Sequence, residues 1–198
     1  MSRLIPACAL GAALALGLTG VAGAATYEID RTHSSVGFKV RHLGVGNVNG
    51  SFQDFAGTFE FDPADERTWK AEATIQTASI TTGNERRDNH LRSADFFDAA
   101  AHPTLTFKST GARKTAEGTY ELMGDLTMRG VTKPVVLALE LLGTTTDPQG
   151  NLRAGFSAAG KINRKDFGVS WSQTLDNGGL VVGEEVRILL EIEGVAKP

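Results

Sequence analysis

The sequence predicts an all-β fold: an eight-stranded antiparallel barrel with a short helical segment between its third and fourth strands. Three observations predict it. Apolar and polar residues alternate with a period of two in segment after segment. Short links rich in Gly, Asn, Asp and Pro separate most of these segments, which favours antiparallel neighbours. One interval, 84–91, breaks the alternation and is polar enough for a surface helix.

The alternating segments number eight. They lie near 27–42, 49–62, 68–80, 103–111, 118–128, 133–146, 151–164 and 181–195. In the first, apolar Val36, Phe38 and Val40 alternate with Gly37, Lys39 and Arg41. The second is bounded by the turn residues Asn49-Gly50 and Asp62-Pro63. In the third and fourth, every second residue is again apolar, as at Trp69, Ala71, Ala73, Ile75, Leu105 and Phe107.

The last four segments carry one apolar face each, with one exception. The shared faces are Tyr120, Leu122, Leu126 and Met128; Ala154, Phe156, Ala158 and Ile162; and Val186, Ile188, Leu190 and Ile192. The exception is the stretch 135–142, which is apolar on both faces apart from Glu140. This strand is therefore expected either to be covered on both sides or to meet another subunit in part.

Closure into a barrel removes the edge strands that would otherwise promote aggregation, and a sandwich is the alternative. A barrel of eight strands is near the size at which the interior either fills with side chains or holds one small ligand. A lined cavity is therefore consistent with the pattern.

The chain has 198 residues, of which 41% are hydrophobic and 22% charged, and this fits one domain with a single core. The formal net charge is −3 and no stripe of Lys and Arg is present, so no nucleic-acid partner is expected.

The first 24 residues predict a secretory signal peptide. Met1-Ser2-Arg3 precedes an apolar run over 4–18, and Ala22-Gly23-Ala24 ends the segment, so cleavage is expected after Ala24. The run is shorter than the roughly 20 residues that span a bilayer, and no transmembrane segment is expected elsewhere. The mature domain is therefore predicted to be 25–198, located in the periplasm. Removal of Cys8 excludes disulfides and thiolate chemistry.

No catalytic or metal site is predicted. Asp30, His33 and Ser34 supply the residue types of a hydrolase triad, but adjacent residues on a strand point to opposite faces and no nucleophile elbow is present. The histidines, which could ligate a metal, are scattered over the sequence with no paired spacing: His33, His42, His90 and His102.

The densest polar cluster begins at Asn84 and is expected to form a helix over the barrel mouth, with Asp88 and Arg92 spaced for an i,i+4 ion pair. Two interpretations are open. The cluster either pins the helix through such pairs or meets a polar head group through Arg87, His90 or Arg92. Phe96 and Phe97 follow as an apolar plug or as core anchors.

Seven segments of the mature chain, taken in order, carry a resemblance to a known family. They are 27–38 (YEIDRTHSSVGF), 50–52 (GSF), 84–97 (NERRDNHLRSADFF), 102–109 (HPTLTFKS), 124–135 (GDLTMRGVTKPV), 163–168 (NRKDFG) and 182–186 (VGEEV). On these motifs the chain resembles the YceI-like family of bacterial secreted polyisoprenoid-binding proteins.

The resemblance implies an antiparallel barrel of lipocalin type whose apolar pore holds a long-chain amphiphile, such as an isoprenoid quinone precursor, a polyprenyl lipid or a fatty amide. It implies no enzymatic activity and no cofactor, beyond an isoprenoid quinone or similar lipid bound as ligand. The expected role is passive transport or sequestration of the lipid. The apolar strand-face and gate residues expected to bind it are Phe38, Val40, Phe59, Phe61, Ile75, Phe96, Phe97, Leu105, Phe107, Leu122, Leu126, Leu137, Leu139, Phe156, Ile188 and Leu190.

Two other classes of function stay open from the residues. One is a homodimeric interaction or stress protein without a dedicated lipid, whose sheet face at 135–142 pairs with itself. The other is an exported lipid-modifying enzyme, for which the sequence offers no persuasive acid, base and nucleophile.

Overall fold

A computed structural model describes residues 23–176 and 178–197. The predicted signal peptide lies almost wholly outside these residues. No helix within the two described ranges is both long and apolar enough to cross a bilayer.

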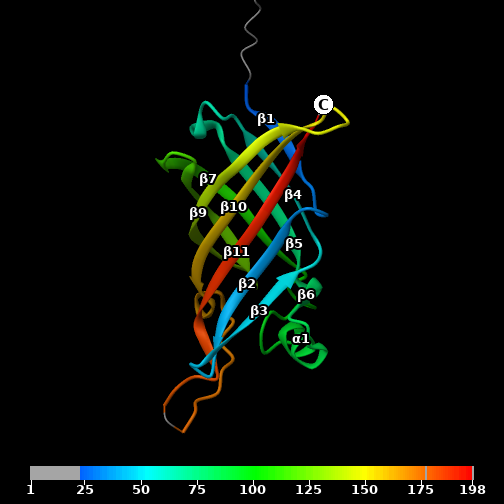
Figure 1. Ribbon diagram of the computed structural model, residues 1–198. Helices are drawn as coiled ribbons and strands as arrows, with labels where there is room; N and C mark the ends of the chain where they lie inside the picture. The colour runs from blue at the N-terminus through cyan, green and yellow to red at the C-terminus, as the bar shows by residue number, and fades with distance from the viewer. Residues whose placement is uncertain (1–22, 177, 198) are drawn as a thin grey trace, which may run out of the picture.

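Eight strands close the barrel, and all neighbouring pairs are antiparallel (Figure 1). In ring order they are β1 (Ala25–Ile29), β4 (Phe55–Phe61), β5 (Lys70–Gln76), β7 (Thr104–Ala116), β8 (Thr119–Met128), β9 (Val131–Thr146), β10 (Leu152–Asn163) and β11 (Val182–Ala196). The ring closes where β1 pairs with β11. The predicted eight-stranded barrel is therefore confirmed, and the sandwich is excluded.

Three further strands lengthen the barrel at its lower end in Figure 1: β2 (Ser35–His42), β3 (Gly46–Phe52) and β6 (Ile80–Thr81). They follow one another outward from β11, whose first residues pair with β2 and whose last residues pair with β1. Because β6 pairs only with β3, this extension has an open side. The helix α1 (Glu85–Arg92) lies there, next to β6 (Figure 1).

The first three predicted strands were wrong in one respect, since each is two strands with a break between them. The segment 27–42 forms β1 and β2, 49–62 forms β3 and β4, and 68–80 forms β5 and β6. At the first break Asp30 closes a turn, because its carboxylate accepts from the Thr32 amide and its carbonyl from the His33 amide. At the third break the 3₁₀ turn Thr77–Ser79 interrupts the strand.

The predicted helix is present, and its anchoring differs from the expectation. Asn84 caps α1 by accepting from the Arg87 amide. The expected ion pair of Asp88 with Arg92 is not a direct contact among the described residues, although the Arg92 charge helps to lower the pKa of Asp88. Asp88 is buried and accepts hydrogen bonds from Thr81 and Thr82. Arg92 donates to the carbonyls of Ala78 and Ile80. Both side chains therefore tie α1 to the strand edge beneath it.

The two faces of β9 differ, which rules out one of the two expectations for 135–142, namely that the strand is covered on both sides. Contact with another subunit stays a prediction. Val135, Leu137 and Leu139 are buried inside the barrel, whereas Val136 and Leu142 are 52% and 60% exposed on the outside. The strand is therefore covered on one side only within this chain.

Candidate functional site

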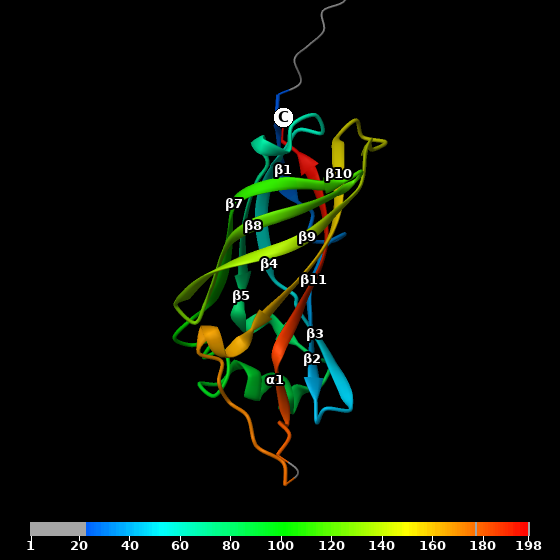
Figure 2. The ribbon, with the colours of Figure 1, turned by 90° about the vertical axis from the view of Figure 1, so that its left-hand side faces the viewer.

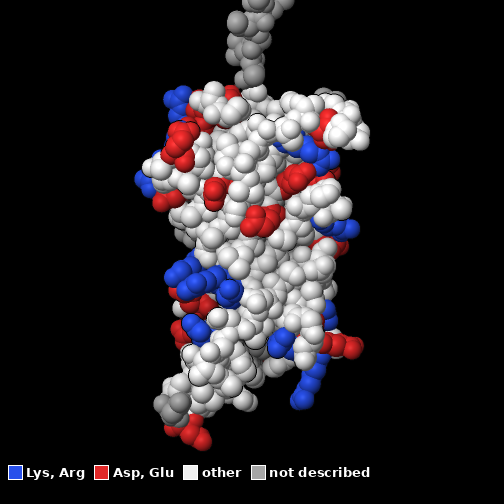
Figure 3. Space-filling model, in the orientation of Figure 1, with Lys and Arg blue, Asp and Glu red and all other residues white. Residues whose placement is uncertain are grey.

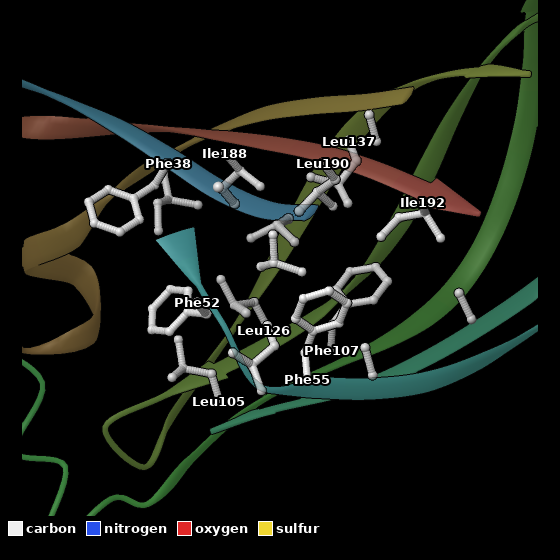
Figure 4. Close-up of a pocket in the computed structure, with 18 of the residues that line it drawn as sticks. Phe38, Phe52, Phe55, Leu105, Phe107, Leu126, Leu137, Ile188, Leu190 and Ile192 are labelled. Atoms are coloured by element: carbon white, nitrogen blue, oxygen red, sulfur yellow. The ribbon is translucent and has the colours of Figure 1, made fainter. Parts of the chain in front are cut away.

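An apolar cavity of about 250 Å³ runs along the inside of the barrel, just below the roughly 300–1,000 Å³ of typical small-molecule pockets. Figure 4 shows the side chains that line it, with Phe38 and Phe52 toward one end and Ile192 toward the other. They come from strands all around the ring because alternate residues of each strand point inward.

Several inward-facing side chains are only half-buried although they sit inside the barrel. Phe38, Phe107, Ile188, Leu190 and Ile192 all line the cavity, and none of them is fully buried. Their accessible surface faces the cavity because the interior is not filled by side chains. The barrel therefore keeps apolar surface available to a guest molecule.

Aromatic rings close the upper end of the cavity, where β1 begins and β11 ends (Figure 1). The six buried rings are Tyr27, Phe59, Phe61, Trp69, Tyr120 and Phe156. Tyr27 stacks on Phe59 with centroids 5.0 Å apart, and Trp69 lies 4.4 Å from Tyr120. The Trp69 indole also donates to the Asp62 carbonyl at 2.7 Å. Burial raises the pKa of the Tyr27 hydroxyl, so it stays neutral.

At the lower end, a second cavity of about 450 Å³ forms a more polar vestibule. The two cavities are contiguous because both are lined by Phe38, Val40, Leu91, Phe96 and Val182. The polar and charged residues of the vestibule are His42, Thr82, Asn84, Arg86, Arg87 and His90. The site is thus an apolar tunnel that opens into a vestibule with cationic side chains.

Three rings stand where the tunnel meets the vestibule. His90 makes edge-to-face contacts with Phe96 and with Trp171, each with centroids 4.9 Å apart. Phe96 and Trp171 contact each other at 5.1 Å. His90 Nε2 lies 2.9 Å from Asp95 Oδ2, which fixes the ring orientation. The cluster joins α1 to Trp171, which lies in the loop segment 168–176, and it narrows the passage.

Arg164 is a buried cation in the tunnel wall, 4% exposed. Its guanidinium donates to the carbonyls of Val169, Val182 and Gly183 at 2.6, 3.1 and 2.9 Å. Burial lowers its pKa from the ordinary arginine value. These hydrogen bonds hold both ends of the loop over 168–181 against the barrel.

The structure brings together all sixteen side chains that the sequence nominated for ligand binding, since each lines the tunnel: Phe38, Val40, Phe59, Phe61, Ile75, Phe96, Phe97, Leu105, Phe107, Leu122, Leu126, Leu137, Leu139, Phe156, Ile188 and Leu190. Contact of these residues with a ligand stays a prediction.

The three head-group candidates are not equally placed. Arg87 and His90 line the vestibule, and Arg87 also donates to the side chain and carbonyl of Thr82. Arg92 lies outside the vestibule lining, because its guanidinium is held by the Ala78 and Ile80 carbonyls and by Asn89.

Sequence reasoning did not nominate several lining residues. Phe52 and Phe55 flank the break between β3 and β4, where a single continuous strand was expected. Trp171, Val169 and Arg164 lie in or beside an irregular loop that has no period to read. Val36, which also lines the tunnel, alternates with Phe38 and Val40, so the sequence could have shown it. The loop residues carried no such signal.

A polar cluster of Asp30, His33 and Glu193 lies apart from both cavities, and Arg153 holds its carboxylates together. Arg153 donates to Asp30, Asp147 and Glu193, and His33 Nδ1 lies 2.8 Å from Asp30 Oδ2. Asp30, His33 and Glu193 come close enough to share a metal ion, but Arg153 already neutralises both carboxylates. The Ser34 hydroxyl bonds to the Glu193 backbone and not to His33.

A family model, the YceI-like domain, matches residues 27–194. The chain belongs to the YceI-like family. Curated relatives agree: it is 43% identical to a UPF0312 protein of Azotobacter vinelandii over 98% of each chain. It is 44% identical to Protein YceI of Escherichia coli over 89% of this chain and 90% of that one.

Solved structures show the same fold. The YceI protein of Campylobacter jejuni superposes with a TM-score of 0.68 and 36% identity, covering 85% of this chain and 96% of that one. BcnA of Burkholderia cenocepacia gives 0.74 and 25% identity over 83% and 98%. A polyisoprenoid binding domain from Saccharophagus degradans gives 0.64 at 15% identity over 86% and 98%, a likeness of fold alone.

Proposed function

We propose that this YceI-like protein binds a long-chain amphiphile, of the isoprenoid or fatty class, with its tail in the tunnel and its head group in the vestibule. Binding is non-catalytic, and the protein carries or sequesters the lipid in the periplasm after cleavage of residues 1–24. The proposed export rests on the signal-like composition of that segment.

The observation that carries the proposal is an unfilled apolar tunnel, closed by rings at one end and open to a polar vestibule at the other. An apolar tunnel with a polar opening fits an amphiphile, which has an apolar tail and a polar head group. Removing a tail from water is favourable by about 25 cal/mol per Å² of apolar surface, before the costs of ordering the chain. Tail burial can therefore supply affinity with little head-group recognition.

Within the vestibule, Arg87 and His90 are the proposed head-group contacts, and Arg86 joins them on the same lining. The Arg87 guanidinium is oriented by Thr82 on one side. Arg92 serves the fold and is not assigned to the head group.

The comparisons support the proposal in two ways. The Saccharophagus degradans domain of the same fold is described as polyisoprenoid binding. The curated relatives carry no enzymatic name. A binding role without chemistry is consistent with both.

The proposal is tested by filling the tunnel. Ala158 is buried and lines it, whereas its neighbour Ala159 is exposed on the outside of the same strand. We expect Ala158→Phe to weaken the binding of cis-parinaric acid, measured by fluorescence titration, by tenfold or more, at a stability cost of roughly 1–3 kcal/mol.

Ala159→Phe is the matched control and leaves binding unchanged. Circular dichroism confirms that both variants are folded. Equal binding by a folded Ala158→Phe variant would show that the tail does not occupy the tunnel.

A second candidate role is self-association, favoured by an outward apolar patch on adjacent strands. Val136 and Ala138 of β9 lie beside Ala159 of β10 and Leu189 of β11. Figure 3 shows uncharged surface across the middle of the corresponding face. A homodimer formed there would leave the tunnel mouth free, so the two roles are compatible.

A further inference from the structure

The rim of the tunnel mouth is built by three segments at the lower end of the molecule (Figures 1 and 2). They are the turn 43–45 between β2 and β3, the helix α1, and the described parts, 168–176 and 178–181, of the loop that precedes β11. His42, the last residue of β2 before the turn, lines the vestibule together with Arg86 of α1 and Val181 of the loop, so the three segments lie around the same opening.

The turn 43–45 presents aliphatic side chains to water. Val45 is 86% exposed and Leu43 is 40% exposed. The turn is fixed in place, because the Leu43 amide donates to the Val181 carbonyl and the Val45 amide to the His42 carbonyl. Tight turns usually carry polar residues, Gly or Pro. An aliphatic tip on a fixed ribbon is instead suited to entering the head-group region of a bilayer.

Two cations accompany this tip. Arg41 precedes the turn and Arg86 lies on α1; both are exposed, and neither guanidinium has a hydrogen-bond or ion-pair partner within the described chain. The ribbon from Ser35 to Phe52 contains Lys39 and Arg41 but no Asp or Glu. Nearby acids are mostly paired: Asp95 with His90, Glu184 with Lys165 and Glu185 with Lys161. Glu85 and Asp176 are further exposed acids of the neighbouring segments.

The acidic side chains of the face in Figure 3 are most numerous in its upper half. The protein as a whole is acidic, yet the ribbon that carries the aliphatic tip is basic. Lys and Arg near a membrane surface attract anionic lipid head groups. Charge therefore favours an approach to such a surface with the mouth first.

We propose that the rim docks on a bilayer containing anionic phospholipid, with Leu43 and Val45 in the interface and Arg41 and Arg86 against the phosphates. The inference rests on the proposed function, since a docked mouth lets the tail pass between bilayer and tunnel. The partner is a lipid surface.

The test is flotation of the mature protein with vesicles of phosphatidylglycerol and phosphatidylcholine. We expect the protein to float with these vesicles, and to float less with phosphatidylcholine alone or at high salt. Val45→Asp lowers the partition coefficient about tenfold, and Arg41→Gln about fivefold. Leu142→Asp is the matched control: Leu142 is equally aliphatic and 60% exposed but lies near the other end of the barrel, so its partition is unchanged.

Vesicle-free titration with cis-parinaric acid separates this inference from the lipid-binding function. The inference predicts that Val45→Asp binds the fatty acid as the unsubstituted protein does, but takes it up more slowly from vesicles. Docking is overturned, and the function stands, if the protein binds the fatty acid in solution but does not float with vesicles. The same conclusion follows if the Val45→Asp and Leu142→Asp variants float equally. Flotation without fatty-acid binding would contradict the function instead.

Discussion

Gly50 makes room for an aromatic ring at the point where tunnel and vestibule meet. A Cβ atom at this position would lie 2.3 Å from Phe38 Cζ and 2.9 Å from Thr82 Cγ2. Phe38 lines both cavities. A larger residue at position 50 must therefore displace the Phe38 ring, and the open tunnel is the space that can receive it.

We expect Gly50→Ala to narrow this passage and to weaken fatty-acid binding about tenfold, because the displaced Phe38 ring takes up tunnel space, and to cost roughly 1–3 kcal/mol of folding stability through overpacking. Fluorescence titration measures it. Gly46→Ala on the same strand is the control, because its Cβ would have 4.0 Å of clearance. An unchanged affinity for a folded Gly50→Ala variant would show that Phe38 does not control entry.

Asp147 links folding stability to pH. Hydrogen bonds from the Asn151 side chain and amide, followed by that from Arg153, lower its pKa to about 2. The pKa of Asp30 is also about 2, through His33 and Arg153. Unfolded Asp titrates near 3.9. Because the folded pKa is the lower one, the stabilisation is present above about pH 4 and is lost as the pH falls toward 2.

Urea unfolding at pH 7 and pH 2.5 checks this linkage. The unsubstituted protein is expected to lose stability between the two conditions. Asp147→Asn lowers the stability at pH 7 and leaves a smaller difference between the two pH values. Asp176→Asn, an exposed site, serves as control and keeps the full difference. The same difference in the Asp147 variant would contradict the assignment.

Alternation predicted much of the tunnel wall that comes from strands, but not Phe52, Phe55 or the loop residues. Once a strand is recognised, its period fixes which residues share a face, so Ile188 and Leu190 could be placed together from sequence. Arg164 and Trp171 could not, because their positions depend on where an irregular loop folds back. Arg92 was nominated by its charge, but its partners are carbonyls of another segment.

The helix α1 covers the open side of the barrel extension, and the buried carboxylate of Asp88 anchors it there. Burial alone would raise the pKa of Asp88, but hydrogen bonds from Thr82 and Thr81 outweigh it and hold the pKa below its ordinary value. Three donors depend on this one side chain.

Asp88→Ala is expected to destabilise the fold by about 1–3 kcal/mol, because it leaves the donors of Thr81 and Thr82 without their partner. Urea unfolding at pH 7 measures the change. Glu85→Ala, exposed on the same helix, changes stability by less than about 0.5 kcal/mol. Equal effects of the two substitutions would contradict the anchoring role of Asp88.

The elements also show where strand prediction fails. The breaks at 30–34, 53–54 and 77–79 fall inside runs that contain strand residues on both sides, so each pair of strands was read as one. The strand β7 extends beyond its predicted end at residue 111. The prediction stopped there because Arg113, Lys114 and Thr115 are polar and show no apolar alternation. Whether such residues belong to a strand depends on backbone pairing with a neighbouring strand and not on the local sequence pattern.

At the scale of the whole molecule, the outward apolar patch of Val136, Ala138, Ala159 and Leu189 is a candidate surface for self-association. A two-fold homodimer would use the same patch on both copies. We expect the mature protein to have dimeric mass in size-exclusion chromatography with light scattering, and Val136→Asp to shift it to the monomer. A monomeric mass for the unsubstituted protein at high micromolar concentration would exclude this patch as a self-association surface.

The central claim is that the tunnel of this YceI-like protein holds a lipid tail. Native mass spectrometry of mature protein purified from a bacterial periplasm, followed by organic extraction, tests it most directly. We predict a complex with one long-chain isoprenoid or acyl compound per tunnel, absent from the Ala158→Phe variant and present in Ala159→Phe. A lipid-free mass that persists after incubation with geranylgeraniol and long-chain fatty acids would contradict the claim and favour a role in protein interaction.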